Sequence, residues 1–88
     1  MAQIIWTEPA LDNLNDIAEY IAVSNPYAAK QLVENVFGKI QRLEQFPDSG
    51  RVPEEISNLN YREVVVNPCR VFYKVDRDSV YILQSKRR

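Results

Sequence analysis

The chain contains no histidine, and this absence limits the chemistry available to it. Histidine is the side chain that most often acts as a general acid or base near neutral pH, and it is a common metal ligand. The single cysteine, Cys69, has no partner for an internal disulfide and lacks the spacing of a metal site. No histidine is present to activate its thiol as a nucleophile. The sequence therefore predicts no metal, no cofactor and no catalytic residue.

Long apolar runs are missing as well. No segment approaches the roughly 20 residues needed to span a bilayer, and residues 1–6 lack the basic start of a signal peptide. We therefore expect a cytoplasmic protein without membrane contact. The 88 residues, 45% of them hydrophobic, indicate one folded domain over residues 1–88, near the lower size limit for a self-sufficient core.

Charge is distributed unevenly along the chain, although the net charge is only −1. Residues 1–50 contain three basic and seven acidic side chains, whereas residues 51–88 contain eight basic and five acidic ones. A protein that mainly binds a phosphate backbone is usually basic overall, and this one has a pI near 5.4. The low net charge and the acidic pI therefore favour a protein target over nucleic acid.

Two helices are predicted in the first half of the chain, after a short strand at residues 3–6. Thr7 stands where the first helix needs an N-cap, and Asn25 and Pro26 end that helix and begin the second, which closes at Phe46-Pro47. The short link between them predicts an antiparallel helix hairpin. Apolar side chains recur every three or four residues and form two core-facing stripes: Ala10, Leu11, Leu14, Ile17, Ala18 and Ile21, then Ala29, Leu32, Val33, Val36, Phe37, Ile40 and Leu43.

The second half is predicted to form an irregular loop at residues 51–58, followed by strands near 61–66, 70–75 and 79–84. The turns between the strands are short enough to require antiparallel pairing. The predicted fold class is α+β, with an N-terminal short strand and an α-helical hairpin packed on one face of a small antiparallel β-sheet.

A set of basic side chains follows these strands. Because side chains alternate between the two faces of a strand, Arg62, Arg70 and Lys74 are predicted to converge on the face that the helices leave open. Arg51 from the loop and an exposed, flexible basic end complete a candidate site for an anionic partner, either RNA or an acidic protein segment: Arg51, Arg62, Arg70, Lys74, Lys86, Arg87 and Arg88. The alternative is an ordinary surface on which these cations pair with nearby carboxylates: Glu54, Glu55, Glu63, Asp76 and Asp78.

The order of the predicted elements and three short stretches resemble the RelE/ParE superfamily of bacterial type II toxin–antitoxin modules. The stretches are Pro47-Asp48-Ser49-Gly50-Arg51, Arg62-Glu63 and Cys69-Arg70-Val71-Phe72-Tyr73. The resemblance covers nearly the whole chain and is closer to the ParE branch. It implies a small toxin that is neutralised by a cognate antitoxin, whose disordered C-terminal segment wraps around it in a hetero-oligomer.

The superfamily has two functional branches. RelE-like members cleave mRNA in the ribosome with a cluster of basic residues, often with a late tyrosine or histidine, whereas ParE-like members poison DNA gyrase. Arg62 and Arg70 match positions where the nuclease branch places phosphate-binding arginines, and Glu54 lies in a loop where some members carry a carboxylate. The end of this chain departs from that pattern, because it reads Gln84-Ser85-Lys86-Arg87-Arg88 where many relatives carry a histidine or tyrosine.

Tyr73 and Tyr81 remain as titratable groups, but their positions in predicted strands indicate aromatic residues in or beside the core. The resemblance therefore implies a ParE-like toxin that causes growth inhibition and plasmid stabilisation by trapping the cleaved complex of DNA gyrase. We expect the final strand and the basic residues 86–88 to make the contact with gyrase. Two alternatives stay open. One is a RelE-like, ribosome-dependent mRNA endonuclease, and the other is an inactive member that only binds antitoxin.

Overall fold

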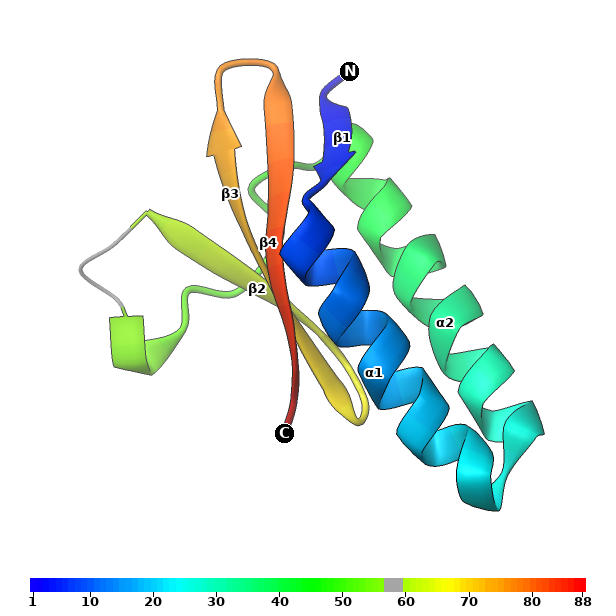
Figure 1. Ribbon diagram of the computed structural model, residues 1–88. Helices are drawn as coiled ribbons and strands as arrows, with labels where there is room; N and C mark the ends of the chain where they lie inside the picture. Colours follow the sequence, from blue (N-terminus) through cyan, green and yellow to red (C-terminus); the bar gives the residue numbers. More distant parts are fainter. Residues whose placement is uncertain (57–59) are drawn as a thin grey trace.

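The computed structural model describes residues 1–56 and 60–88, and Figure 1 shows a helix hairpin beside a twisted sheet. The chain forms β1 (Gln3–Trp6), α1 (Glu8–Ser24), α2 (Pro26–Gln41), β2 (Tyr61–Val66), β3 (Cys69–Asp76) and β4 (Ser79–Arg87). Two 3₁₀ turns, η1 (Arg42–Glu44) and η2 (Glu54–Ile56), lie between α2 and β2. The loop predicted at residues 51–58 thus contains a 3₁₀ turn, and its part at residues 57–58 lies outside the described residues. Neither α1 nor α2 is long and apolar enough to cross a membrane.

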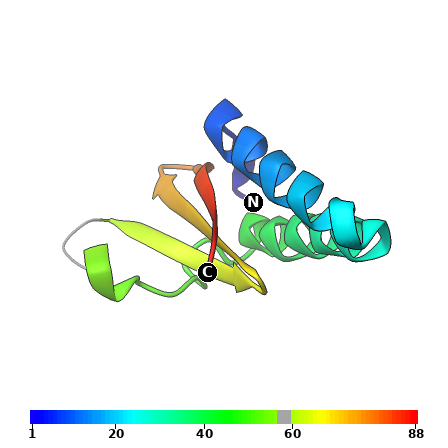
Figure 2. The ribbon, with the colours of Figure 1, turned by 60° about the horizontal axis from the view of Figure 1, so that its bottom comes forward.

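The four strands form one sheet in the order β1-β4-β3-β2. β2 pairs antiparallel with β3, and β3 pairs antiparallel with β4, whereas β1 runs parallel to β4. Figure 2 shows α1 and α2 together on one side of this sheet. The predicted α+β class is confirmed, as is the helix hairpin on a small sheet, and the parallel first strand makes the sheet mixed.

The predicted capping residues stand at the ends of the helices, with one difference in what they bond. Asn25 Oδ1 accepts a hydrogen bond from the backbone N–H of Ala28 at 3.0 Å, and Pro26 occupies the first turn of α2. Thr7 is the N-cap residue of α1, but its hydroxyl donates to the carbonyl of Ile82 in β4 at 2.6 Å. Thr7 therefore joins the start of α1 to the sheet, and its side chain does not cap the first helical N–H groups.

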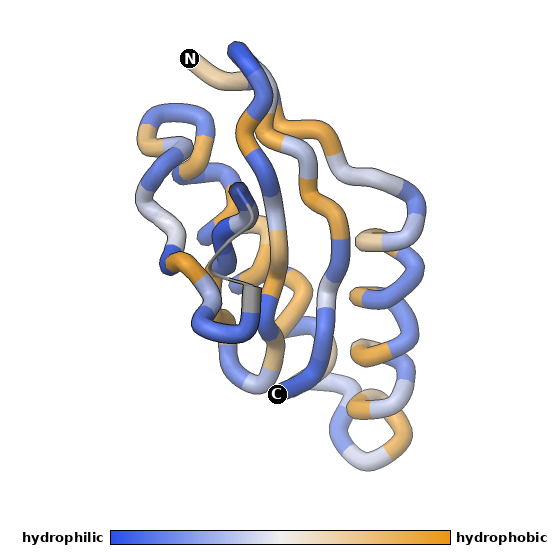
Figure 3. The backbone as a smooth tube through the Cα atoms, turned by 90° about the vertical axis from the view of Figure 1, so that its left-hand side faces the viewer, coloured by the Kyte–Doolittle hydropathy of each residue, from blue (hydrophilic) through white to orange (hydrophobic). Residues whose placement is uncertain are grey.

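The hydrophobic core lies between the helix hairpin and the side of the sheet that faces it. In Figure 3 the outer side of α1, on the right, is hydrophilic and its inner side is hydrophobic. Phe37 and Leu11 belong to the predicted stripes but lie at the margin of the core, each 41% exposed. The Phe37 ring packs 4.8 Å from that of Trp6. The buried core includes side chains from both helices, from η1 and from β3 and β4: Ala10, Leu14, Leu32, Val36, Ile40, Leu43, Val71, Tyr73, Val80 and Ile82.

β4 continues past its predicted end at residue 84 and runs to Arg87. The reason is Ser85, whose side chain is buried against α1. Its hydroxyl donates to the carbonyl of Ala10 at 3.2 Å, and its backbone N–H donates to Asn13 Oδ1 at 3.3 Å. The basic end is therefore part of a strand through Arg87, and the prediction of a flexible tail is wrong.

Candidate functional site

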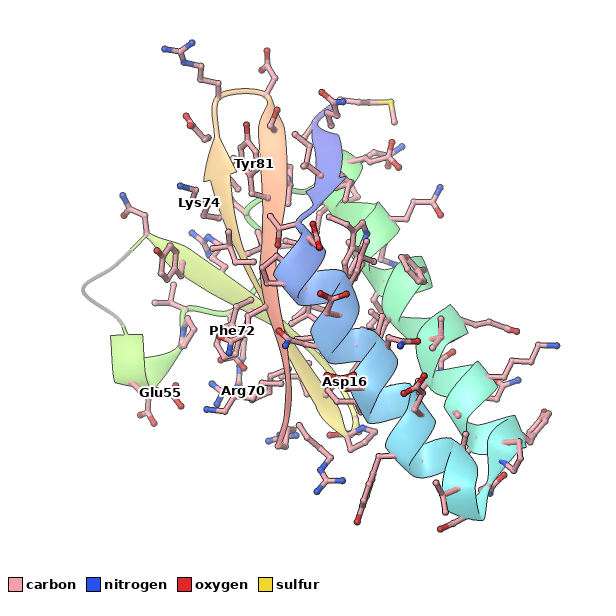
Figure 4. The ribbon with its side chains drawn as sticks, in the orientation of Figure 1. Asp16, Glu55, Arg70, Phe72, Lys74 and Tyr81 are labelled. Carbon is pink, nitrogen blue, oxygen red and sulfur yellow. The ribbon has the colours of Figure 1, made fainter. Side chains whose placement is uncertain are left out.

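The side of the sheet turned away from the helices, called the open face below, carries most of the predicted cations. Residues that lie directly opposite each other in an antiparallel pair point to the same side of a sheet. Figure 4 shows Arg70, Phe72 and Lys74 on the side of the sheet away from α1. With their partners in the neighbouring strands, the residues of the open face are Tyr61, Glu63, Val65, Arg70, Phe72, Lys74, Tyr81, Gln84 and Lys86.

Arg62 does not belong to the open face, and the predicted convergence with Arg70 and Lys74 is wrong for this residue. Arg62 lies opposite Tyr73, whose side chain is buried in the core on the helix side. Its Nη1 donates to the carbonyl of Gly50 at 2.9 Å, and its Nε lies 3.9 Å from Asp48 Oδ1. Arg62 therefore holds the loop that precedes β2 and contributes its charge to another side of the molecule.

Arg70 is the centre of an ion-pair cluster on the open face. Its Nε and Nη2 donate to Glu63, with Nε 3.1 Å from Glu63 Oε1. Its Nη1 and Nη2 donate to the two carboxylate oxygens of Glu55, each at 3.0 Å. The guanidinium also lies 4.9 Å from the centroid of the Phe72 ring, and the side chain is only 18% exposed. Two carboxylates thus engage this arginine in the paired, forked geometry that guanidinium groups favour.

Glu63 is the buried member of the cluster, and sequence reasoning considered it only as one ordinary surface partner. Its side chain is fully buried and also accepts a hydrogen bond from Arg51 Nη2 at 3.0 Å. The Arg70 hydrogen bonds are the main cause that lowers the pKa of Glu63, with Arg51 adding to them and burial opposing them. The same arginine lowers the pKa of the exposed Glu55 to about 2. Both carboxylates are ionised at neutral pH, so they balance the charges of Arg51 and Arg70.

A groove of about 290 Å³ runs over the open face beside this cluster. Tyr61, Phe72 and Leu83 line it with apolar surface, and the polar and charged side chains that line it are Glu55, Arg70, Gln84 and Lys86. The aromatic residues of this groove were not recognised in the sequence as site residues. Their alternation with core residues in β2 and β3 is the pattern that identifies them, since every second residue of a strand faces away from the core.

The three basic residues at the end of the chain are exposed but do not point to one place. Lys86 lies opposite Arg70 and joins the open face. Arg87 lies on the helix side, with its guanidinium carbon 4.5 Å from the centroid of the Tyr20 ring. Arg88 donates from Nη1 to Asn67 Oδ1 at 2.9 Å, near the turn between β2 and β3. Only Lys86 therefore extends the cation set formed by Arg70 and Lys74.

Tyr73 is a structural residue, as its strand position predicted. Its ring is fully buried, its hydroxyl donates to the carbonyl of Pro47 at 2.8 Å, and that hydroxyl accepts from the N–H of Gly50 at 2.9 Å. Burial raises the pKa of this hydroxyl, and burial likewise raises the pKa of the Cys69 thiol. Neither group is positioned or ionised for proton transfer at the open face.

Comparison with known proteins identifies the family. Residues 4–84 match the family model described as ParE toxin of type II toxin-antitoxin system, parDE. Toxin RelE2 of Caulobacter vibrioides is 33% identical over 85 residues, which cover 96% of this chain and 92% of that protein. Putative toxin Y4kP of Sinorhizobium fredii is 32% identical over 76 residues, which cover 86% of this chain and 78% of that protein.

Solved structures share the fold. The chromosomal ParDE TA system from P. aeruginosa contains a chain that superposes with a TM-score of 0.83 at 23% identity, covering 99% of this chain and 96% of that one. The toxin–antitoxin complex RelBE2 from Mycobacterium tuberculosis gives a TM-score of 0.64 at 19% identity, covering 99% and 91%. The family match and the fold agree with the resemblance seen in the sequence. The chain therefore belongs to the ParE toxin family within the RelE/ParE superfamily, and it is a toxin of the type II toxin–antitoxin class.

Proposed function

We propose that this toxin inhibits DNA gyrase by trapping the cleaved DNA complex, and that a cognate antitoxin neutralises it in the cytoplasm. Trapping a transient state requires only that the toxin bind that state more tightly than the others. It requires no acid or base on the toxin. The open face, with its aromatic groove and flanking cations, suits such a binding role.

The observation that carries the proposal is the engagement of Arg70. RNA cleavage through the 2′-hydroxyl needs a base, a proton donor and cations that are free to hold the scissile phosphate. Arg70 instead directs four hydrogen bonds to Glu55 and Glu63, so a phosphate must compete with two ionised carboxylates. The low pKa values of those carboxylates also make them weak bases.

A second candidate is a ribosome-dependent mRNA endonuclease. One observation that favours it is the relative named Toxin RelE2, which covers nearly the whole chain. Another is the presence of Lys74 and Lys86 on the open face, neither of which forms an ion pair with any described residue. These lysines are available for phosphate, although Arg70 is not.

The antitoxin part of the proposal is supported by two solved relatives, one from a ParDE TA system and one from the toxin–antitoxin complex RelBE2. A partner segment that is disordered when free gains order on binding, and such segments wrap large surfaces. We therefore propose a toxin–antitoxin hetero-oligomer as the resting form of this protein.

The test combines two purified systems. With DNA gyrase and supercoiled plasmid, the toxin should increase linear DNA, and the Lys74→Ala/Lys86→Ala double variant should weaken this effect. Lys30→Ala, an exposed lysine on α2, is the matched control and should behave as wild type. In a translating extract, primer extension should show no new codon-positioned mRNA ends. New ends together with unchanged gyrase activity mean that the nuclease function is correct, and inactivity in both systems alongside tight antitoxin binding identifies an inactive member.

A further inference from the structure

The guanidinium of Arg70 has two forked edges, and a carboxylate of the same chain occupies each of them. The edge formed by Nε and Nη2 donates to Glu63, and the edge formed by Nη1 and Nη2 donates to Glu55. A guanidinium binds a phosphate through the same parallel pair of donors that it offers to a carboxylate. Glu55 and Glu63 therefore hold the two positions on Arg70 that a phosphate group would take.

The two carboxylates differ in how firmly the fold holds them. Glu63 has a fully buried side chain that is also bound by Arg51, so it is a fixed part of the sheet. Glu55 has a side chain that is 60% exposed, and it comes from the 3₁₀ turn η2 instead of a strand. Exposed ion pairs contribute little to stability because water and salt screen them. Glu55 is therefore the carboxylate that can be removed without disturbing the core.

The Glu55–Arg70 pair stands between two hollows of the surface, and Figure 4 shows the two side chains beside each other below η2. One hollow is the groove of about 290 Å³ on the open face, where Lys86 adds a positive charge. The other has a volume of about 480 Å³ and is lined by Arg51 and Arg88. Glu55 and Arg70 are the residues that line both hollows. Cations thus lie on both sides of Glu55, and this carboxylate divides them.

We propose that Glu55 is a specificity-determining residue, which occupies the exposed edge of Arg70 and thereby keeps the phosphate groups of nucleic acid out of the open face. This inference deepens the proposed function, because it names the residue that reserves the face for a protein target. The other side chains of the groove suit a nucleotide, since Tyr61 and Phe72 offer aromatic surface to a base and Lys86 offers charge to its phosphate. Removal of one carboxylate should therefore uncover a phosphate site that the fold already holds in place through Glu63.

The test measures the Kd of the full chain for a fluorescently labelled 12-nucleotide oligouridine by anisotropy at low salt. Glu55→Ala should bind it about fivefold or more tightly than wild type, because the anionic competitor for Arg70 is gone. Glu54→Ala is the matched control, since it removes the same charge from the neighbouring position of η2 and Glu54 forms no ion pair with a described residue. Its Kd should change less than about twofold. Gains of equal size in the two variants indicate a general effect of net charge and overturn the proposal.

The side-chain Nε–H resonance of Arg70 supplies a second readout that reports on the site itself. In proton–nitrogen correlation spectra, inorganic phosphate should shift this resonance in Glu55→Ala but not in wild type or Glu54→Ala. Glu55→Gln keeps the size of the side chain and should show a gain in oligouridine affinity of the same direction. Thermal melting verifies that each variant is folded.

Two results would overturn the assignment of Glu55. One is a wild-type Kd in both Glu55 variants, and the other is a phosphate-induced shift of Arg70 that is as large in wild type as in Glu55→Ala. These titrations contain no gyrase, so either result leaves the proposed inhibition of gyrase standing. A wild-type toxin that fails in the gyrase cleavage assay refutes that function and leaves the role of Glu55 to be judged from the titrations alone.

Discussion

Two glycines allow the same substitution to be made in opposite environments. A Cβ added at Gly50 meets Tyr73 Oη at 2.5 Å, Tyr73 Cε1 at 2.7 Å and the backbone carbonyl of Glu63 at 2.9 Å. A Cβ added at Gly38, in the last turn of α2, meets nothing within 4 Å. We therefore expect Gly50→Ala to destabilise the fold and Gly38→Ala to stabilise it.

The loss of stability expected for Gly50→Ala follows from the groups that the new Cβ must displace. Overpacking of a tight site costs about 1–3 kcal/mol. The Tyr73 hydroxyl bonds both Pro47 and Gly50, and displacing it weakens two hydrogen bonds of about 0.5–1.5 kcal/mol each. The total of about 2–6 kcal/mol is a large part of the roughly 4–13 kcal/mol expected for a domain of this size. Gly38→Ala should add about 0.5–1 kcal/mol, because alanine has the higher helix propensity and restricts the unfolded chain.

Urea unfolding followed by far-UV circular dichroism measures both effects. With a slope of about 1 kcal/mol per molar urea, the midpoint should fall by about 2 M or more in Gly50→Ala and rise by about 0.5–1 M in Gly38→Ala. Tyr73→Phe removes the atom nearest to the new Cβ, so its loss of stability should be less than additive with that of Gly50→Ala. A wild-type midpoint for Gly50→Ala, or shifts of the same sign at the two glycines, would refute the reasoning.

Two further predictions concern the ion-pair cluster and the helix cap. The pKa of Glu55, about 2, and the lowered pKa of Glu63 both lie below the ordinary value of 4.5. The stabilisation that comes from the ionised carboxylates is therefore present above pH 4.5 and is lost as the pH falls from there toward 2. The melting temperature should therefore fall less between pH 5 and pH 3 in Glu63→Gln than in wild type, and an equal fall would contradict the assigned cause. Asn25→Ala should reduce the free energy of unfolding by about 1 kcal/mol because it removes the acceptor for the N–H of Ala28, whereas Asn25→Ser should retain most of it in the same urea assay.

The elements of the fold could be predicted because their signals are local. The three- and four-residue apolar spacing marks both helices, and Asn25-Pro26 marks the break between them. The end of β4 could not be predicted in this way. Ser85 is polar and resembles the start of a tail, yet it is buried by hydrogen bonds to α1 that span more than 70 positions in the sequence. A polar residue becomes a core residue wherever the fold supplies its partners, and those partners are known only once the chain is folded.

The position of Arg62 is a different kind of error, because the information for it was present. Alternation assigns two faces within each strand but does not say which face of β2 matches which face of β3. A turn of two residues at Asn67-Pro68 determines that match, since it places Val66 opposite Cys69. Counting back four pairs then puts Arg62 opposite Tyr73 and on the core side. The error came from treating the strands separately.

The cluster around Arg70 changes how mutations of the cations in the candidate site should be interpreted. Among the described residues, Arg70→Ala leaves the fully buried Glu63 with Arg51 as its one remaining ion-pair partner, and a poorly compensated buried charge is strongly destabilising. Loss of toxicity in that variant is therefore expected from unfolding alone, and it is no evidence of phosphate binding unless stability is measured. Lys39 and Arg42 are exposed and form no ion pair with described residues, so their substitution separates binding from folding. Substitution of Lys39 and Arg42, which lie in the acidic first half of the sequence (residues 1–50), is for this reason a more decisive test of where a partner docks than substitution of Arg70.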